Sequence, residues 1–86
     1  MTWRSSAGVR SAVTIRGVLL FAGGHHRVLE DAEAALWDLL SRGYSLDAAT
    51  RLLAAVAGVT RPEAERLAEQ SVAEWAEAGL IEVADG

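Results

Sequence analysis

The feature that most constrains the fold is a change in the spacing of apolar residues between positions 17 and 40. Residues 18–21 form a compact apolar run, Gly23 and Gly24 follow as a turn, and residues 25–29 have the composition of a returning strand. After Asp31 the apolar residues recur at helical spacing, at Ala32, Ala35, Leu36, Leu39 and Leu40. We therefore predict a β-hairpin that leads into a helix, with Asp31 as the helix cap.

A further strand is predicted upstream, over residues 9–15, whose apolar residues alternate with polar or small ones. This alternation would bury Val13 and Ile15 on one face and leave Arg10 and Arg16 on the other, in water. The strand that follows the glycine turn is more polar than the strand that precedes it. A polar last strand favours an edge position in a three-stranded antiparallel sheet.

The remainder of the chain predicts three helices, of which the first covers about residues 31–42. Ser45 is placed to cap the second helix, and residues 60–63, Thr-Arg-Pro-Glu, have the pattern of a capping box with proline in the first turn. Gly79 would end the third helix. Residues 80–83 are apolar enough to pack under the core or to add a last strand.

Apolar stripes at helical spacing predict which helix faces are buried. Trp37 flanks the stripe of the first helix and Trp75 lies on that of the third, and both are predicted to be core or groove-wall residues. The second helix would bury Leu46, Ala49, Leu52, Leu53 and Val56. The third would bury Ala64, Leu67, Ala68, Val72, Trp75 and Ala76.

Length and composition limit the domain organisation and the partners. A chain of 86 residues is long enough for one core, so we expect a flexible lead over residues 1–8, with Trp3 packed back onto the body, and a single domain over residues 9–86. The net charge of −4 argues against nucleic acid as a partner, and a chain without cysteine has no disulfide or thiolate metal site. The longest apolar run, residues 17–24, is too short to span a membrane, so we expect no membrane contact. The absence of cysteine and of a signal-like apolar core at the N-terminus fits a cytoplasmic protein.

Three strands followed by three helices predict an α+β fold, and in that order the chain resembles the PqqD-like domains, also called RiPP recognition elements. The residues that carry the resemblance are Val18-Leu19-Leu20 through Val28-Leu29, Ala34-Ala35-Leu36-Trp37 with Leu39, Gly43, the capping Ser45, and Ala78-Gly79-Leu80-Ile81. The sequence departs from the family in two places. Glu30 follows Leu29 where the family often has asparagine, and His25, His26 and Arg27 stand where it has aromatic residues.

The resemblance implies a fold similar to a winged helix-turn-helix, and a function. Such domains bind the leader region of a ribosomally synthesised precursor peptide as an added antiparallel strand, in the groove between the third strand and the third helix. They present it to a separate maturation enzyme: a lasso-type leader peptidase, a radical enzyme or a cyclase. The implied peptide-binding residues are His26, Arg27, Val28, Leu29 and Glu30 on the strand and Leu67, Gln70, Ser71 and Glu74 on the third helix.

The residues themselves predict no enzyme, no cofactor and no metal site. His25 and His26 are adjacent on a strand and would point to opposite faces, so they cannot readily hold one ion together. No motif places a nucleophile beside a base, and Ala22-Gly23-Gly24 does not match a phosphate-binding loop.

Two other classes of function stay open at the level of the sequence. An unoccupied edge strand can pair with its own copy, which would make the chain a structural or oligomerising module, so both a monomer and an edge-strand homodimer are possible. A winged-helix DNA-binding domain would share the helix content. However, only Arg61, Arg66 and Gln70 on the third helix would suit contacts to DNA.

Overall fold

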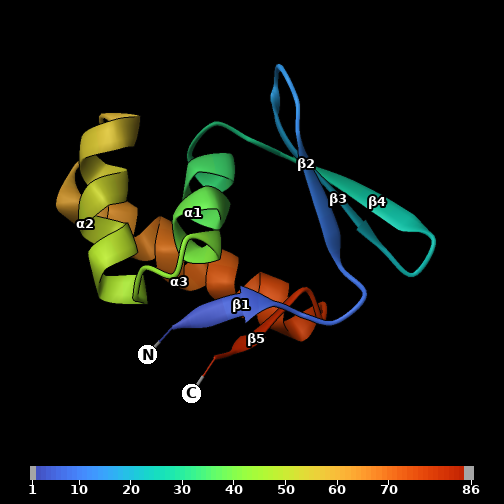
Figure 1. Ribbon diagram of the computed structural model, residues 1–86. Coiled ribbons are helices and arrows are strands. Elements are labelled where there is room, and N and C mark those ends of the chain that lie inside the picture. Colours follow the sequence, from blue (N-terminus) through green and yellow to red (C-terminus); the bar gives the residue numbers. More distant parts are fainter. Residues whose placement is uncertain (1, 85–86) are drawn as a thin grey trace.

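The structure is a computed structural model that describes residues 2–84 (Figure 1), so residues 1, 85 and 86 of the predicted lead and domain lie outside it. It confirms the predicted α+β class, with an antiparallel three-stranded sheet followed by three helices. A second, two-stranded sheet joins the two ends of the described chain. The elements are β1 Trp3–Ser5, β2 Arg10–Val13, β3 Gly17–Ala22, β4 His25–Glu30, α1 Asp31–Ser41, α2 Leu46–Ala57, α3 Arg61–Glu77 and β5 Ile81–Val83.

The three-stranded sheet has the order β2-β3-β4 and packs on the helices through one face. Val18 pairs with Leu29 in the β3–β4 register, and both side chains are buried together with Leu20. The expectation that Val13 and Ile15 would be buried is wrong, since they are 87% and 106% exposed. The alternation is present, but the β2–β3 hairpin projects away from the helices, so no layer covers its tip (Figure 1).

Tight backbone hydrogen bonds shape the tip of the β2–β3 hairpin. The Thr14 N–H donates to the Gly17 carbonyl at 2.7 Å and the Gly17 N–H donates back to the Thr14 carbonyl at 3.3 Å. Gly17 has φ +155, and a Cβ there would lie 2.0 Å from the Leu29 carbonyl oxygen of the neighbouring strand. Only glycine therefore allows β3 to begin this close to β4.

The segment expected as a loose lead contains strand β1, which pairs antiparallel with β5 and places Trp3 opposite Val83. The Ser6 N–H also donates to the Leu80 carbonyl at 2.9 Å. Trp3 is half-buried and packs against the core, as predicted. The C-terminal apolar residues do both things that were predicted for them, since Leu80 and Ile81 are buried in the core and Ile81–Val83 form strand β5.

Helix starts follow the predicted caps in two cases out of three. The Ser45 hydroxyl accepts from the Ala48 N–H at 3.2 Å, and the Thr60 hydroxyl accepts from the Glu63 N–H at 3.3 Å. The assignment of Asp31 as the cap of α1 is wrong: Glu30 occupies the cap position, and its side chain makes no capping hydrogen bond. β4 passes into α1 without a loop, so the extended last residue of the strand becomes the cap, and Asp31 takes a positive φ of 52.

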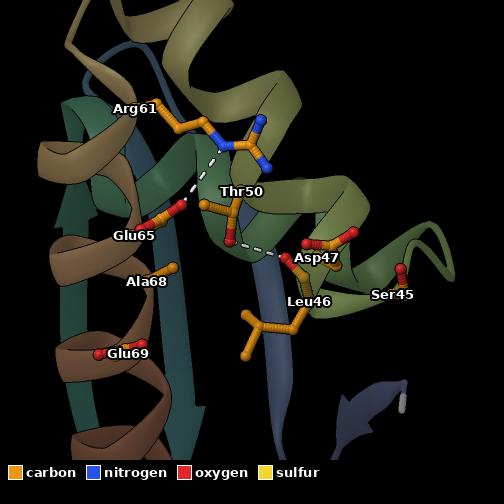
Figure 2. Close-up of a pocket in the computed structure, with 8 residues that line it drawn as sticks. All are labelled: Ser45, Leu46, Asp47, Thr50, Arg61, Glu65, Ala68 and Glu69. Atoms are coloured by element: carbon orange, nitrogen blue, oxygen red, sulfur yellow. Dashed lines mark hydrogen bonds and ion pairs between the residues drawn. The ribbon is translucent and has the colours of Figure 1, made fainter.

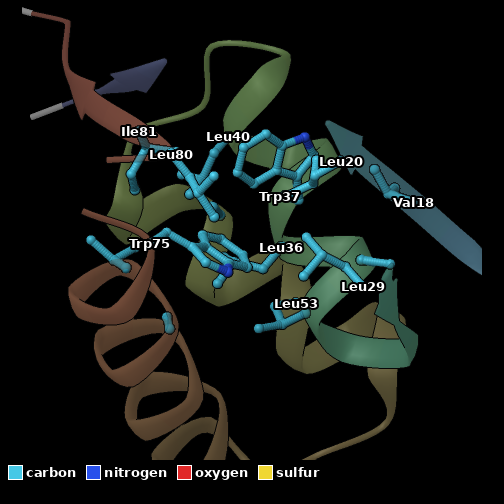
Figure 3. Close-up of a cluster of buried hydrophobic side chains, with 14 of the residues drawn as sticks. Val18, Leu20, Leu29, Leu36, Trp37, Leu40, Leu53, Trp75, Leu80 and Ile81 are labelled. Atoms are coloured by element: carbon cyan, nitrogen blue, oxygen red, sulfur yellow. The ribbon is translucent and has the colours of Figure 1, made fainter. Parts of the chain in front are cut away.

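The core lies where the three helices meet the inner face of β3 and β4 (Figure 3). Trp37 and Trp75 pack edge to face with ring centroids 5.2 Å apart, and both are buried in the core, one of the two positions predicted for them. On α2 only Ala49, Thr50 and Leu53 are buried.

The predicted burial of Leu52 and Val56 on α2 is wrong, because in the described part of the chain α2 packs mainly on α1 and α3 and these two side chains lie on its exposed side. Thr50 is buried in their place, with its hydroxyl donating to the Leu46 carbonyl at 2.7 Å. No helix within residues 2–84 is both long and apolar enough to cross a membrane.

Candidate functional site

β4 lies at an edge of the three-stranded sheet, as the polar sequence of the strand predicted. Among the described residues it pairs with β3 alone. The N-terminal segment does not cover it, because β1 pairs with β5 in the other sheet. The outer edge of β4 is therefore a row of backbone groups available to another strand.

The register shows which residues of β4 offer these groups. Gly23 and Gly24 form the turn between Ala22 and His25, and residues that flank such a two-residue turn form a hydrogen-bonded pair. Hydrogen-bonded and non-hydrogen-bonded pairs then alternate along an antiparallel ladder. The N–H and C=O groups that point away from β3 are consequently those of His26, Val28 and Glu30.

The side chains of successive β4 residues point to opposite faces of the sheet. Arg27 and Leu29 share the face of Leu20 and Val18, their partners on β3, which is the face directed at the helices. Leu29 is 1% exposed and belongs to the core, whereas Val28 on the outer face is 47% exposed. Leu29, one of the predicted site residues on this strand, therefore presents no side chain to an added strand.

A groove separates the β3–β4 hairpin from the C-terminal end of α3. Its volume is about 300 Å³. It is open to solvent and combines an apolar floor with polar residues of β4 at its rim. The residues that line it are Leu20, Ala22, His25, His26, Arg27, Ala78 and Leu80.

The predicted residues of α3 fall into two groups. Ser71 is buried and Leu67 is half-buried against the core, whereas Gln70 and Glu74 are exposed. Of these four, Glu74 is the one that an ion pair connects to β4. Ala78, one helical turn beyond Glu74, lines the groove. The assignment of these side chains to peptide binding stays a prediction.

Arg27 connects β4 to two helices. Its guanidinium Nη2 lies 3.6 Å from Glu74 Oε2 on α3 and 4.0 Å from Glu33 Oε2 on α1. All three side chains retain substantial exposure to solvent, so the ion pairs contribute little to stability. Their effect is to place one positive and two negative charges where the strand, the groove and the helices meet.

Sequence reasoning missed Glu33 and the groove residues Leu20, Ala22, His25, Ala78 and Leu80. A signal for Leu20 and Ala22 was present, because they alternate with Leu19 and Phe21 and so face the helices with Val18. For Glu33, Ala78 and Leu80 no local signal exists, since their positions depend on how α1 and α3 pack against the sheet.

A second, larger pocket of about 450 Å³ lies between α2 and α3 (Figure 2). Its prominent polar groups have partners: the Thr50 hydroxyl donates to the Leu46 carbonyl, and Arg61 Nε donates to Glu65 Oε1 at 3.3 Å. No group of three or more histidine or acidic residues able to hold a metal ion occurs within residues 2–84. The pocket shares no residue with the groove at β4.

No model of a known protein family matches the chain, and no curated protein matches it. Two solved structures do. A lasso peptide synthetase B1 complexed with the leader peptide has a TM-score of 0.85 and 26% identity, and the match covers 96% of this chain and 100% of that one. TbiB1 in complex with the TbiA(beta) leader peptide has a TM-score of 0.84 and 27% identity, over 95% of this chain and 99% of that one. These two structures confirm the resemblance that the sequence indicated.

Proposed function

We propose that this chain, a PqqD-like peptide-recognition domain by its resemblance and fold, binds the leader region of a ribosomally synthesised precursor peptide as a strand added to β4. The observation that carries the proposal is the free edge of β4 beside a groove, in a fold whose two solved neighbours are complexes with leader peptides. We further propose that the chain presents the bound precursor to a separate maturation enzyme.

Backbone hydrogen bonds would supply affinity that tolerates many leader sequences. His26, Val28 and Glu30 direct N–H and C=O groups away from β3, and an antiparallel leader strand would pair with all of them. Each such bond contributes about 1 kcal/mol net. Side chains of the leader that enter the groove over Leu20 and Leu80 would then add specificity.

A binding role accounts for the groove better than catalysis does. Its floor is apolar, and its polar rim consists of exposed side chains of one strand. A module of this kind helps an enzyme by raising the effective concentration of the precursor and by orienting the segment to be modified. The partner that we propose is a leader peptidase, a radical enzyme or a cyclase, and the binding step itself needs no cofactor.

The proposal is tested by the substitution Val28→Pro, which removes an N–H that points away from β3 and so leaves the β3–β4 ladder intact. The genes adjacent to that of this chain are searched for a precursor, and its leader, labelled with fluorescein, is titrated by fluorescence anisotropy. We expect binding about tenfold weaker or worse, because one carbonyl of the leader loses its donor.

Ser11→Pro is the matched control. The Thr14–Gly17 hydrogen bonds fix the β2–β3 ladder so that the N–H of Ser11 points to the opposite free edge, on β2. This variant loses an equivalent donor and should bind the leader like the wild type. Circular dichroism confirms that both variants are folded. Undiminished binding by folded Val28→Pro would contradict the edge-strand proposal.

The same free edge also supports the structural alternative, in which β4 pairs with its copy in a symmetric dimer. Native mass spectrometry with and without leader peptide separates the two functions. A monomer, or a dimer that dissociates as leader binds, agrees with leader recognition. A stable dimer that ignores the peptide would support the structural module.

A further inference from the structure

We propose that Arg27 makes the groove selective for leaders that carry an aspartate or glutamate at the position opposite it in the added strand. This inference rests on the proposed function, since it names the side chain that the same site would select. It does not follow from the resemblance, because the family has aromatic residues where this chain has Arg27 and its neighbours.

The pairing geometry brings one leader side chain directly against Arg27. On the β3 side, Arg27 forms a hydrogen-bonded pair with Leu20, so its backbone groups point away from the free edge. In a strand added to that edge, the residue opposite Arg27 would stand in a non-hydrogen-bonded pair. Such pairs have the shorter Cα separation, about 4.5 Å, and the closer side chains. Their side chains also point to the same face, here the face of the helices and the groove.

Arg27 has its hydrogen-bonding capacity free for such a partner. Its contacts with Glu74 and Glu33 are at 3.6 and 4.0 Å, and within residues 2–84 its side chain makes no hydrogen bond. By contrast, Arg4 donates to Glu82 at 2.9 Å. A guanidinium carries a fork of donors that fits a carboxylate with two parallel hydrogen bonds. Opposite charges are also the favourable cross-strand pair at this position.

Breaking the ion pair between Glu74 and Arg27 would cost little free energy. Its carboxylate is exposed and lies close to the C-terminal end of α3, where the helix dipole disfavours negative charge and the last turn has no basic residue. On leader binding it can return to water while the leader carboxylate takes its place beside Arg27. Glu74 is therefore a competitor of the leader side chain, and Glu33 at 4.0 Å is a weaker one.

Selectivity for a basic leader residue would change the effect that Glu74 has on leader binding. If the two carboxylates bound a basic leader residue and Arg27 merely balanced them, removal of the Glu74 charge would weaken leader binding. If Arg27 binds an acidic leader residue, the same change removes a competitor and strengthens binding. The direction of the Glu74→Gln effect therefore decides between the two charges.

The experiment measures the dissociation constant of the labelled leader for the wild type, Arg27→Gln, Glu74→Gln and Arg16→Gln. Arg16 lies at the exposed tip of the β2–β3 hairpin, so its variant removes the same charge away from the groove. We expect Arg27→Gln to weaken binding about tenfold, as the loss of a charge-assisted hydrogen bond does. Glu74→Gln should strengthen it by roughly two- to threefold, the effect of an exposed ion pair. Arg16→Gln should leave it unchanged.

A second series locates the leader residue. Each aspartate and glutamate of the leader is replaced in turn by asparagine or glutamine, and every peptide is titrated against the wild type and Arg27→Gln. One replacement should weaken binding to the wild type about tenfold and have almost no effect on the variant, because the partner charge is already absent.

The inference fails if Arg27→Gln binds like Arg16→Gln, if Glu74→Gln weakens binding, or if the bound leader segment has no acidic residue. In each of these cases Val28→Pro still reports on the proposed function. Loss of binding in Val28→Pro without the Arg27 effect leaves leader recognition standing and removes only the charge selectivity. Retention of binding in folded Val28→Pro removes the edge-strand function itself.

Discussion

The helical half of the molecule and the three-stranded sheet are stabilised in different ways. The helices enclose the Trp37–Trp75 pair together with Leu36 and Leu53, all of them buried (Figure 3). The sheet adds large buried side chains from one face only, namely Val18, Leu20 and Leu29, and every residue of β2 is exposed. The helices therefore provide most of the apolar burial, and the sheet is a platform that holds β4 at the surface.

The exposed outer face of the sheet affects how an added strand would be accommodated. Within residues 2–84 no layer covers the outer face of the sheet, and Val28 and Phe21 remain about half exposed. Twisting of β2, whose residues are all exposed, would therefore disturb few buried contacts, and regions with few buried contacts open at lower free energy than the core. Val18, Leu20 and Leu29 meanwhile hold β3 and β4 against the helices that form the groove wall.

The largest effect in this comparison is expected from Trp75→Ala. Trp75 is the largest fully buried side chain within residues 2–84, and its truncation removes both that volume and the edge-to-face contact with Trp37. We expect a loss of about 3–5 kcal/mol in the free energy of unfolding. This is a large share of the roughly 4–13 kcal/mol typical of a chain of this length. Urea denaturation followed by circular dichroism measures it.

Val56→Ala on α2 is the control for that prediction. Its side chain is 68% exposed, so its truncation should change the free energy of unfolding by no more than about 0.5 kcal/mol. A Trp75→Ala loss below about 1.5 kcal/mol would mean that the helices do not carry the stability assigned to them.

An intermediate loss of stability is expected from Leu29→Ala on β4, and Val28→Ala at the neighbouring position is the comparison. Leu29→Ala removes one of the three side chains that anchor the sheet and should cost about 2–5 kcal/mol. Val28→Ala changes only the outer face and should cost less than about 1 kcal/mol. Thermal unfolding of the two variants side by side gives the comparison. Equal losses would show that the sheet is not anchored through one face.

The sequence predicted those features whose signal is local. The turn at Gly23-Gly24, the polar edge strand and the caps at Ser45 and Thr60 depend on residues close together in the chain, and the structure has all of them. The β1–β5 pair had no such signal, because Trp3 and Val83 meet only after the whole domain has folded.

The incorrect burial predictions came from apolar patterns that do form the expected strand or helix but have no other element packed on them. Val13 and Ile15 alternate as in a half-buried strand, yet nothing covers the hairpin tip, so they stay in water. Similarly, α2 carries a broad apolar stripe of which only the part facing α1 and α3 is buried. The position of Glu74 relative to Arg27 depends on the packing of α3 and not on any pattern near either residue.

The smallest change in stability is expected at the helix starts, where α3 has a side-chain capping hydrogen bond and α1 has none. In Thr60→Ala, α3 loses the hydroxyl that accepts from the Glu63 N–H, and we expect a loss of about 1 kcal/mol. Thr60→Ser keeps the acceptor and should restore most of it. At the start of α1, Glu30→Gln should change stability by less than about 0.5 kcal/mol, because the Glu30 side chain makes no capping hydrogen bond. Chemical denaturation of the three variants measures these differences. A clear loss of stability in Glu30→Gln would show that this carboxylate stabilises the junction between β4 and α1. The sheet and the helices would then not be stabilised independently where they join.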